Sequence, residues 1–318
     1  MVRKWACSMK IGGHSLTGRK AGLLLLLAVL LLGLVLMWIS IKYEHINLGF
    51  KDMIGIMLKK TEIISRMRAS LLTSVDAEKS AVMADTDEAS RAFADQSRQA
   101  ADAVDRDRRE LGLLVEKDHT EREMELLREF DGCWAESRKI DQVLLELAVE
   151  NTNIKAANLS FGEGSSALER YEQALTDVKR SASSSRNANQ ISDLVYNAVT
   201  AGLKIHYLQA PHIAAANDDQ MDKIEADIKH QNDLIRSSLS TLKHLVPKEK
   251  QASLRQAEAA YDELARVTAE VIALSRQNTN IKSFELSLGR KRKVTAQCDE
   301  ILIKLEEGVR SKAFTGTR

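Results

Sequence analysis

The sequence predicts an all-α protein: one N-terminal transmembrane helix, then two repeated and stacked four-helix-bundle modules of long antiparallel helices. Three observations support this prediction. Aromatic residues are only 4% of the chain and charged residues 29%, with two prolines in 318 residues, a composition typical of helix bundles. A long uncharged stretch lies near the N-terminus, and one pentapeptide occurs twice.

The uncharged stretch runs from Ala21 to Ile41, and a helix of its 21 residues would span roughly 30 Å, the thickness of a bilayer core. Trp38 and Tyr43 lie near its end, where such rings prefer the membrane interface. A cleaved signal peptide is the rival interpretation, but it would have a shorter apolar core and a small-residue cleavage site. We therefore expect an uncleaved anchor at 21–41.

The orientation of this anchor follows from the charges before it. Residues 1–20 carry five basic residues and no acid. This asymmetry predicts that 1–20 is a cytoplasmic N-terminus and that everything after Lys42 lies outside the cytoplasm. We expect a single-pass protein of the inner (cytoplasmic) membrane with an extracytoplasmic or periplasmic C-terminal region.

The first exterior helix is expected to present a narrow heptad seam to other helices. The seam consists of Ile46, Phe50, Met53, Met57, Ile64, Met67 and Leu71, with Lys60 at its one polar step. Helix breaks are expected where capping residues cluster, at 85–87, 118–120, 217–219 and 247–248, and a turn at 162–166. The polar stretch 181–189 is either a loop or part of one long helix, so 164–216 forms one helix or two.

The repeated pentapeptide Asn-Thr-Asn-Ile-Lys occurs at 151–155 and 278–282. Neighbouring residues match at the same spacing of 127, as the following pairs show: Trp134 and Tyr261, Glu136 and Glu263, Leu147 and Leu274, Leu159 and Leu286, Ser160 and Ser287. Such matches predict a duplication. We expect helical bundle module 1 at 43–185 and module 2 at 186–318, each the size of one four-helix bundle.

The first Asn of each copy falls on a seam of otherwise apolar residues. The two seams are Ile140, Leu144, Leu147, Asn151, Ile154 and Phe161, and Val267, Val271, Leu274, Asn278, Ile281 and Leu288. A buried Asn can fix helix register, begin a turn, or line a cavity that binds an amide or carboxylate. Asn151 and Asn278 are therefore candidate ligand-binding residues, although register or a turn is the favoured interpretation.

The basic N-terminus, single membrane helix and exterior bundle resemble the sensory half of methyl-accepting chemotaxis receptors. The stretch from Leu144 to Leu175, with Asn-Thr-Asn-Ile-Lys-Ala-Ala-Asn-Leu-Ser-Phe-Gly-Glu-Gly, is similar to the third-to-fourth helix region of their four-helix-bundle domain. Two such bundles, over residues 43 to about 314, further resemble the helical bimodular sensor domain.

The resemblance implies a membrane-anchored extracytoplasmic chemoreceptor-like protein in signal transduction. It would bind a small organic acid or amino acid and act as a homodimer or with a partner receptor. Such receptors hold anions with arginines, whose donor fork matches a carboxylate. Arg66 and Arg68 are candidates, but they lack the family's spaced arginine set, and a solvated helix face is the favoured alternative.

The sequence departs from that family after the exterior region. Between residue 43 and Arg318 it has no second membrane helix, HAMP linker or cytoplasmic signalling hairpin. We therefore expect a ligand collector, a partner of another receptor or a truncated receptor remnant. A structural coiled-coil spacer or scaffold of the cell envelope is the alternative from a different class.

Other kinds of chemistry have no sequence support. The seven histidines are scattered and no phosphate loop or nucleophile elbow is present, so we expect no enzyme, no cofactor and no metal site. A net charge of +1 does not favour nucleic acid. Cys7, Cys133 and Cys298 form no even framework and are expected to be buried thiols. The basic run 290–293 is expected to be a solvated face, with anionic lipid or protein as the alternative.

Overall fold

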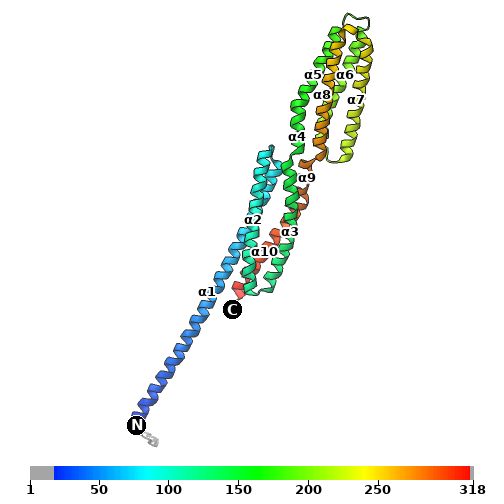
Figure 1. Cartoon of the computed structure of the whole chain (residues 1–318). Coiled ribbons are helices and arrows are strands. Elements are labelled where there is room, and N and C mark those ends of the chain that lie inside the picture. Colours follow the sequence, from blue (N-terminus) through cyan, green and yellow to red (C-terminus); the bar gives the residue numbers. More distant parts are fainter. Residues whose placement is uncertain (1–17, 316–318) are drawn as a thin grey trace, which may run out of the picture. The chain divides into compact units, whose positions relative to one another are not determined.

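The computed structural model describes the backbone of residues 18–315 and the side chains of residues 27–42 and 51–311. Helices fill nearly all of these residues and no strand occurs among them, which confirms the all-α class with long helices (Figure 1). The α-helices are α1 (Gly18–Met83), α2 (Asp87–Asp118), α3 (Glu121–Glu150), α4 (Thr152–Leu159), α5 (Ser165–Ser181), α6 (Ala188–Ile213), α7 (Asp218–Leu245), α8 (Gln251–Gln277), α9 (Thr279–Leu286) and α10 (Arg292–Thr315). Two π-helices, η1 (Ser160–Gly164) and η3 (Ser287–Lys291), and the 3₁₀-helix η2 (Lys248–Lys250) complete them.

The chain forms two compact units, residues 1–61 with 310–318 and residues 62–309. In the first unit, α1 includes the whole expected membrane segment, and the apolar side chains between Leu27 and Ile41 are exposed. The basic segment 1–20 and residues 21–26 lie outside the described side chains. Within the residues that are described, no helix contains a stretch both long and apolar enough to cross a bilayer.

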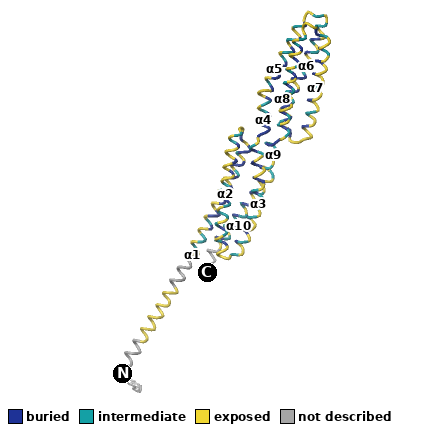
Figure 2. Tube along the Cα trace, viewed as in Figure 1, coloured by how far each residue is buried: buried dark blue, intermediate teal, exposed yellow. Residues whose placement is uncertain are grey.

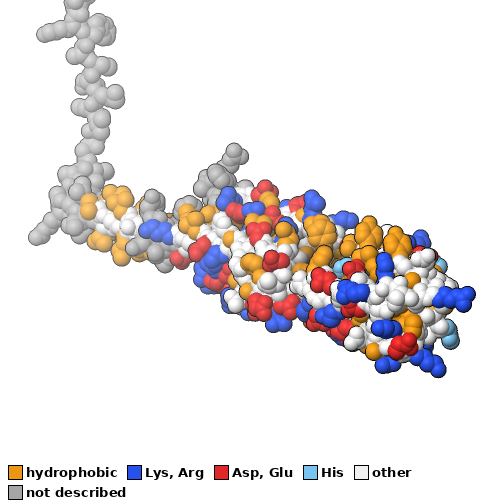
Figure 3. Space-filling model, turned by 90° about the horizontal axis from the view of Figure 1, so that it is seen from above, with side chains coloured by type: hydrophobic (Ala, Val, Ile, Leu, Met, Phe, Trp, Pro, Cys, Tyr) orange, Lys and Arg blue, Asp and Glu red, His pale blue; other side chains and the backbone are white. Residues whose placement is uncertain are grey.

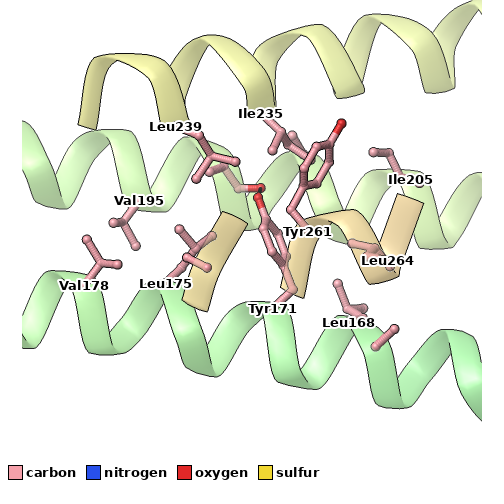
Figure 4. Packing of buried hydrophobic residues seen from close by; sticks show 14 of the residues in the cluster. Leu168, Tyr171, Leu175, Val178, Val195, Ile205, Ile235, Leu239, Tyr261 and Leu264 are labelled. Atoms are coloured by element: carbon pink, nitrogen blue, oxygen red, sulfur yellow. Dashed lines mark hydrogen bonds between the residues drawn. The ribbon is translucent and has the colours of Figure 1, made fainter. Parts of the chain in front are cut away.

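In the second unit, α5, α6, α7 and α8 pack around a shared apolar core, and we call them the second helix group. Figure 4 shows side chains from all four helices pointing into this core. Tyr171 of α5 is fully buried and its ring centroid lies 6.1 Å from that of Tyr261 on α8. The Tyr171 hydroxyl donates to the carbonyl of Ala198 at 3.0 Å, so this large side chain is buried without an unpaired polar atom.

The first helix group consists of α1 from Glu62 onward, α2, α3 and α10 up to Val309. Its core includes Ile64, Met67 and Leu71, all fully buried, which confirms this part of the expected α1 seam. Ser74 of α1 and Ser97 of α2 exchange hydrogen bonds at 2.9–3.2 Å across the core. In both groups the buried faces point inward and the exposed faces outward (Figure 2).

The cysteine prediction was wrong. Cys133 of α3 and Cys298 of α10 form a disulfide, with their Cα atoms 5.7 Å apart. The two residues are 165 positions apart and do not occupy equivalent places in the repeat, so nothing local in the sequence pairs them.

Each helix group contains segments from both repeats. α5, from the first repeat, packs against α6 and α8 of the second. α10, from the second repeat, is bonded to α3 of the first through the disulfide. Both α5 and α10 therefore contact helices from the other side of the module boundary, which the sequence predicts between residues 185 and 186.

Most expected helix ends are confirmed. Thr86 caps α2 by accepting from the Ala89 amide at 3.2 Å, and Asn217 caps α7 by accepting from the Gln220 amide at 3.1 Å. A turn separates α5 from α6, so 164–216 holds two helices and not one. The turn expected at 162–166 was wrong, because the π-helix η1 carries the chain straight into α5.

The late part of both predicted seams was also wrong. Phe161 is 73% exposed and Leu288 is 49% exposed, whereas Leu144 and Val271 are fully buried. Each seam crosses a left-handed Asn and then enters a π-helix. Each interruption changes the angular phase of the residues that follow, so a heptad cannot keep one face across it.

Candidate functional site

The two copies of the pentapeptide meet, and we call residues 151–155 and 278–282 the repeat junction. Asn151 ends α3 with φ 51° and Asn278 ends α8 with φ 55°. Asn adopts this left-handed conformation more readily than most residues because its short amide is compatible with it. A new helix starts at the next residue in each copy, so both asparagines begin a turn, as one of the sequence interpretations expects.

Each copy caps the helix that starts in the other. The Thr152 amide donates to the hydroxyl of Thr279 at 3.1 Å, and the Thr279 amide donates to that of Thr152 at 3.2 Å. The Asn153 amide donates to the side-chain oxygen of Asn280 at 3.1 Å, with the reverse bond at 3.2 Å. The first amides of a helix have no partner within it, so α4 and α9 satisfy each other.

In the side chains of Asn151 and Asn278, both the amide oxygen and the amide nitrogen form hydrogen bonds. The Asn151 oxygen accepts from Asn280 at 2.9 Å, and its amide donates to Asp87 at 3.2 Å. The Asn278 oxygen accepts from Asn153 at 2.8 Å, and its amide donates to the carbonyl of Ala215 at 3.2 Å. Both residues are buried, and a ligand at either would have to displace these bonds.

The lysines at the ends of the two pentapeptides form equivalent hydrogen bonds. The ammonium of Lys155 donates to the carbonyl of Glu150, and that of Lys282 to the carbonyl of Gln277, each at 2.8 Å. These are the last carbonyls of α3 and α8, which the helices themselves leave without a partner. The repeated motif thus ends one helix, starts the next and joins the two copies.

The structure places Arg66 and Arg68 in ion pairs within the first helix group. Arg66 is bonded to Asp107 at 2.8 Å and Glu110 at 3.1 Å, both on α2. Arg68 is bonded to Asp299 of α10 at 2.8 Å. The hydrogen bond that Arg66 donates to Asp107 raises the pKa of Arg66, and the one that Arg68 donates to Asp299 raises the pKa of Arg68. Both arginines thereby link α1 to neighbouring helices, through partners that lie outside the repeat junction.

A buried charged cluster was missed by the sequence reasoning. Lys291, from the basic run expected to be solvated, is 2% exposed and donates to Asp141 at 2.6 Å and to Ser137 at 2.7 Å. Glu78 of α1 lies in the same interior, 1% exposed, and neither of its carboxyl oxygens has a hydrogen-bond partner among the described residues. The signal that could have found it is heptad spacing, because Glu78 lies seven residues after Leu71, the last residue of the expected α1 seam.

Burial controls the protonation of this cluster. Desolvation raises the pKa of Glu78, and the nearby Ser287 hydroxyl and Lys291 ammonium only partly oppose it. Desolvation also raises the pKa of Asp141, although Lys291 lowers it. The Oδ1 atom of Asp141 is buried and has no hydrogen-bond partner among the described residues.

A cavity of about 390 Å³ lies between α2 and α3 beside this cluster. Its lining combines three cationic side chains with the buried carboxylate: Ser97, Arg98, Ala101, Arg138, Lys139, Asp141, Gln142 and Leu145. Arg138 is already bonded to Asp102 at 2.8 Å. The lining therefore offers cationic donors to an anion, and the Asp141 carboxylate beside them could accept from a donor group of the same ligand.

A second group of hydrogen-bonded polar side chains lies at the end of α6. His212 contacts Ser275 at 2.8 Å and Glu225 at 2.9 Å, and Arg276 donates to Glu225 at 2.6 Å. The arginine lowers the pKa of Glu225. His212 and Ser275 are fully buried, and the Ser275 hydroxyl donates to the His212 carbonyl at 3.1 Å. This series of hydrogen bonds connects α6 to α8.

No family model, curated protein or solved structure matches this chain. Among the described residues, no group of three or more His, Cys, Asp or Glu side chains is arranged to hold a metal ion.

Proposed function

We propose that this chain is a membrane-anchored extracytoplasmic sensory protein, built from two stacked four-helix-bundle modules, that binds a small solute in signal transduction. The observation that supports this function is the cavity between α2 and α3, whose lining includes cationic side chains and Asp141, a residue with one buried oxygen that has no partner among the described residues. This proposal moves the ligand from the repeat junction, whose amides already have internal partners, to the first helix group.

The lining favours a small molecule with both a carboxylate and a donor, such as an amino acid. Lys139 would bind the carboxylate, together with Arg98 once it exchanges its present partner Asp95, because cationic donors form the stronger charge-assisted hydrogen bonds. An ammonium or hydroxyl group would donate to Asp141 after a small side-chain rotation. This bond would remove the cost of a buried acceptor without a partner, which is about 1–3 kcal/mol.

The anchor and the compartment rest on two further observations. The uncharged segment 21–41 follows a basic N-terminus, which predicts a cytoplasmic start and an exterior remainder. The Cys133–Cys298 disulfide supports an oxidising environment outside the cytoplasm, where such bonds persist. The signal would then pass to the cell interior through a partner receptor.

The test is thermal unfolding of the full chain in detergent, with amino acids, organic acids and amines added one at a time. We expect an amphoteric ligand to raise the melting temperature, and Asp141→Asn to lose most of that rise. Arg122→Gln, an exposed residue of α3 paired with Glu125, is the matched control and should respond like the unaltered chain. Failure of every compound to stabilise the protein would rule out the cavity as a ligand site.

A structural spacer of the cell envelope is the second candidate, and the repeat junction favours it. Reciprocal hydrogen bonds between the two copies join α4 to α9, the helices through which the chain passes between the two helix groups. If the full chain binds no solute while Asn151→Leu with Asn278→Leu alters its localisation or its length in small-angle scattering, the spacer is the better description.

A further inference from the structure

The outward face of α6 carries a second heptad pattern. Its residues follow alternating steps of four and three along the helix and its C-cap: Tyr196, Thr200, Leu203, Tyr207, Ala210 and Ala214. We call these six residues the α6 seam. Tyr196 is 71% exposed, Leu203 is 47% exposed and Tyr207 is 76% exposed. The seam therefore has no partner within the described part of the chain.

The opposite face of the same helix packs inside the bundle. Ile191, Val195, Ala198 and Ile205 are buried in the core of the second helix group. A helix on the surface of a bundle usually has one apolar stripe and a charged outer face. α6 is thus apolar on the side that packs and also along a stripe on the side that faces outward. On the face of the molecule seen in Figure 3, hydrophobic side chains lie in patches between charged ones.

The charges near the seam favour a particular partner. From residue 194 to the end of α6, Lys204 is the only Lys, Arg, Asp or Glu. The neighbouring helix α7 is different, because its exposed face carries Asp222, Lys223, Asp227, Lys229, Asp233 and Arg236. The seam positions of a parallel pair meet their own counterparts, so a charge at a seam position would face a like charge. The α6 seam carries no charge, whereas a charged partner would find nothing to pair with.

We propose that the α6 seam pairs in parallel with the α6 seam of a second copy of this chain. A heptad of apolar residues in steps of four and three is the pattern by which two helices form a left-handed coiled coil. The parallel orientation rests on the proposed membrane anchor, because two copies anchored in one membrane point the same way. Each Tyr196, Leu203 and Tyr207 would then lie against its own counterpart.

The α6 seam would bury only a small area, so we expect the association to be weak. A tyrosine buries about 150–250 Å² when covered, so two largely exposed tyrosines with their smaller neighbours supply a few hundred Å² per copy. That is below the roughly 800 Å² per partner of a standard stable interface. We therefore expect weak association of free chains and efficient association where an anchor raises the local concentration.

Cysteine cross-linking of the full chain in membranes tests the pairing. In a Cys7→Ser background, Leu203→Cys and Tyr207→Cys should each form a disulfide-linked dimer, since equivalent seam positions of a parallel pair come within the Cα distance that a disulfide needs. Leu234→Cys on α7 is the control, because Leu234 is also an exposed apolar residue at 44%. It should remain monomeric under the same oxidation.

A charge in the seam should disrupt the pair without unfolding the chain. Leu203→Glu places two carboxylates opposite each other and should lower cross-linking at Tyr207→Cys about tenfold, equivalent to 1.4 kcal/mol. Leu234→Glu should not. Because Leu203 is exposed, the melting temperature should stay within the range of the Leu234→Glu variant.

Three outcomes would overturn the proposal: no dimer at either seam position, equal dimer at Leu234→Cys, or cross-linking only between Tyr196→Cys and Tyr207→Cys, which would mean an antiparallel pair. The result is independent of ligand binding. If the chain does not fractionate with membranes but still cross-links at Leu203→Cys and Tyr207→Cys, the proposed anchor is wrong and the proposed dimer is supported.

Discussion

Asn151 and Asn278 combine a backbone role with a side-chain role. Their left-handed backbone ends one helix and redirects the chain into the next. Their amides then bond across the repeat junction to Asn280 and Asn153. Glycine could supply the backbone geometry alone, but only a side chain with both an acceptor and a donor can complete the bonds.

Substitutions at Asn278 separate the two roles. Asn278→Gly keeps the left-handed geometry and loses the amide, so it should cost about 1–3 kcal/mol from the partners left without a bond. Asn278→Ala also adds the left-handed penalty of about 1–2 kcal/mol. Chemical unfolding of both variants gives the comparison. Equal free energies of unfolding would show that backbone geometry contributes nothing at this position.

Glu78 is the second residue with a measurable consequence. Its ordinary pKa is 4.5 and burial raises it, so the folded chain holds this proton to higher pH than the unfolded chain does. The contribution of Glu78 to stability is therefore fully present below about pH 4.5. It is lost as the pH rises through the raised pKa.

Glu78→Gln should remove that loss, because glutamine stays uncharged. We expect the free energy of unfolding of the variant to increase relative to that of the unaltered chain as the pH rises from 4.5 to 8. Urea unfolding of both proteins over this range measures the difference, and acid-side effects at Asp87 and Glu225 are common to both. Parallel curves would show that Glu78 keeps its ordinary pKa.

At the scale of elements, the two helical hairpins repeat their contacts as well as their sequence. Trp134 of α3 donates to Asp105 of α2 at 2.6 Å, and Tyr261 of α8 donates to Asn232 of α7 at 2.9 Å. Both donors and both acceptors occupy equivalent positions in the repeat. The duplication therefore preserved how α2 packs on α3 and how α7 packs on α8, while the side chains that form the bond changed.

The packing of α5 on α6 depends on Gly202. A Cβ atom at this position would lie 2.7 Å from the ring of Tyr171, whose side chain is fully buried. Gly202→Ala should therefore destabilise the chain by about 1–3 kcal/mol through overpacking. Thermal unfolding gives the measurement.

Gly132→Ala is the matched control for that prediction. Gly132 lies inside α3 with nothing within 4 Å of an added Cβ. The control should stabilise the chain by up to about 1 kcal/mol, since alanine is the better helix former. If the two substitutions had the same effect, the close contact with Tyr171 would carry no energy.

At the scale of the molecule, the chain crosses twice between the helix groups. The first repeat leaves the first group after α3 and supplies α5 to the second group, and the second repeat returns after α8 to supply α10. Both crossings occur at the repeat junction, where the copies cap each other. The disulfide then joins α3 to α10, so it closes a loop that contains the entire second group.

Removal of that disulfide should be costly, because it constrains a loop of 165 residues in the unfolded chain. We expect Cys133→Ala with Cys298→Ala to lower the free energy of unfolding by about 2–5 kcal/mol. Urea unfolding with and without reductant checks this, with Cys7→Ser as the control. If reductant destabilises the double variant as much as the unaltered chain, the effect does not come from this bond.

The sequence by itself determined the helical class, most helix ends and the duplication, because capping residues, composition and repeated motifs act over a few neighbouring residues. It also singled out Asn151 and Asn278 as polar residues where a bundle should be apolar. Only the tertiary structure decided that these asparagines bond across two copies, that Cys133 meets Cys298, and that Lys291 is buried against Asp141. Those pairings join residues more than a hundred positions apart, and they depend on which helices pack together. A local pattern cannot specify that choice, because several arrangements of the same amphipathic helices bury the same faces.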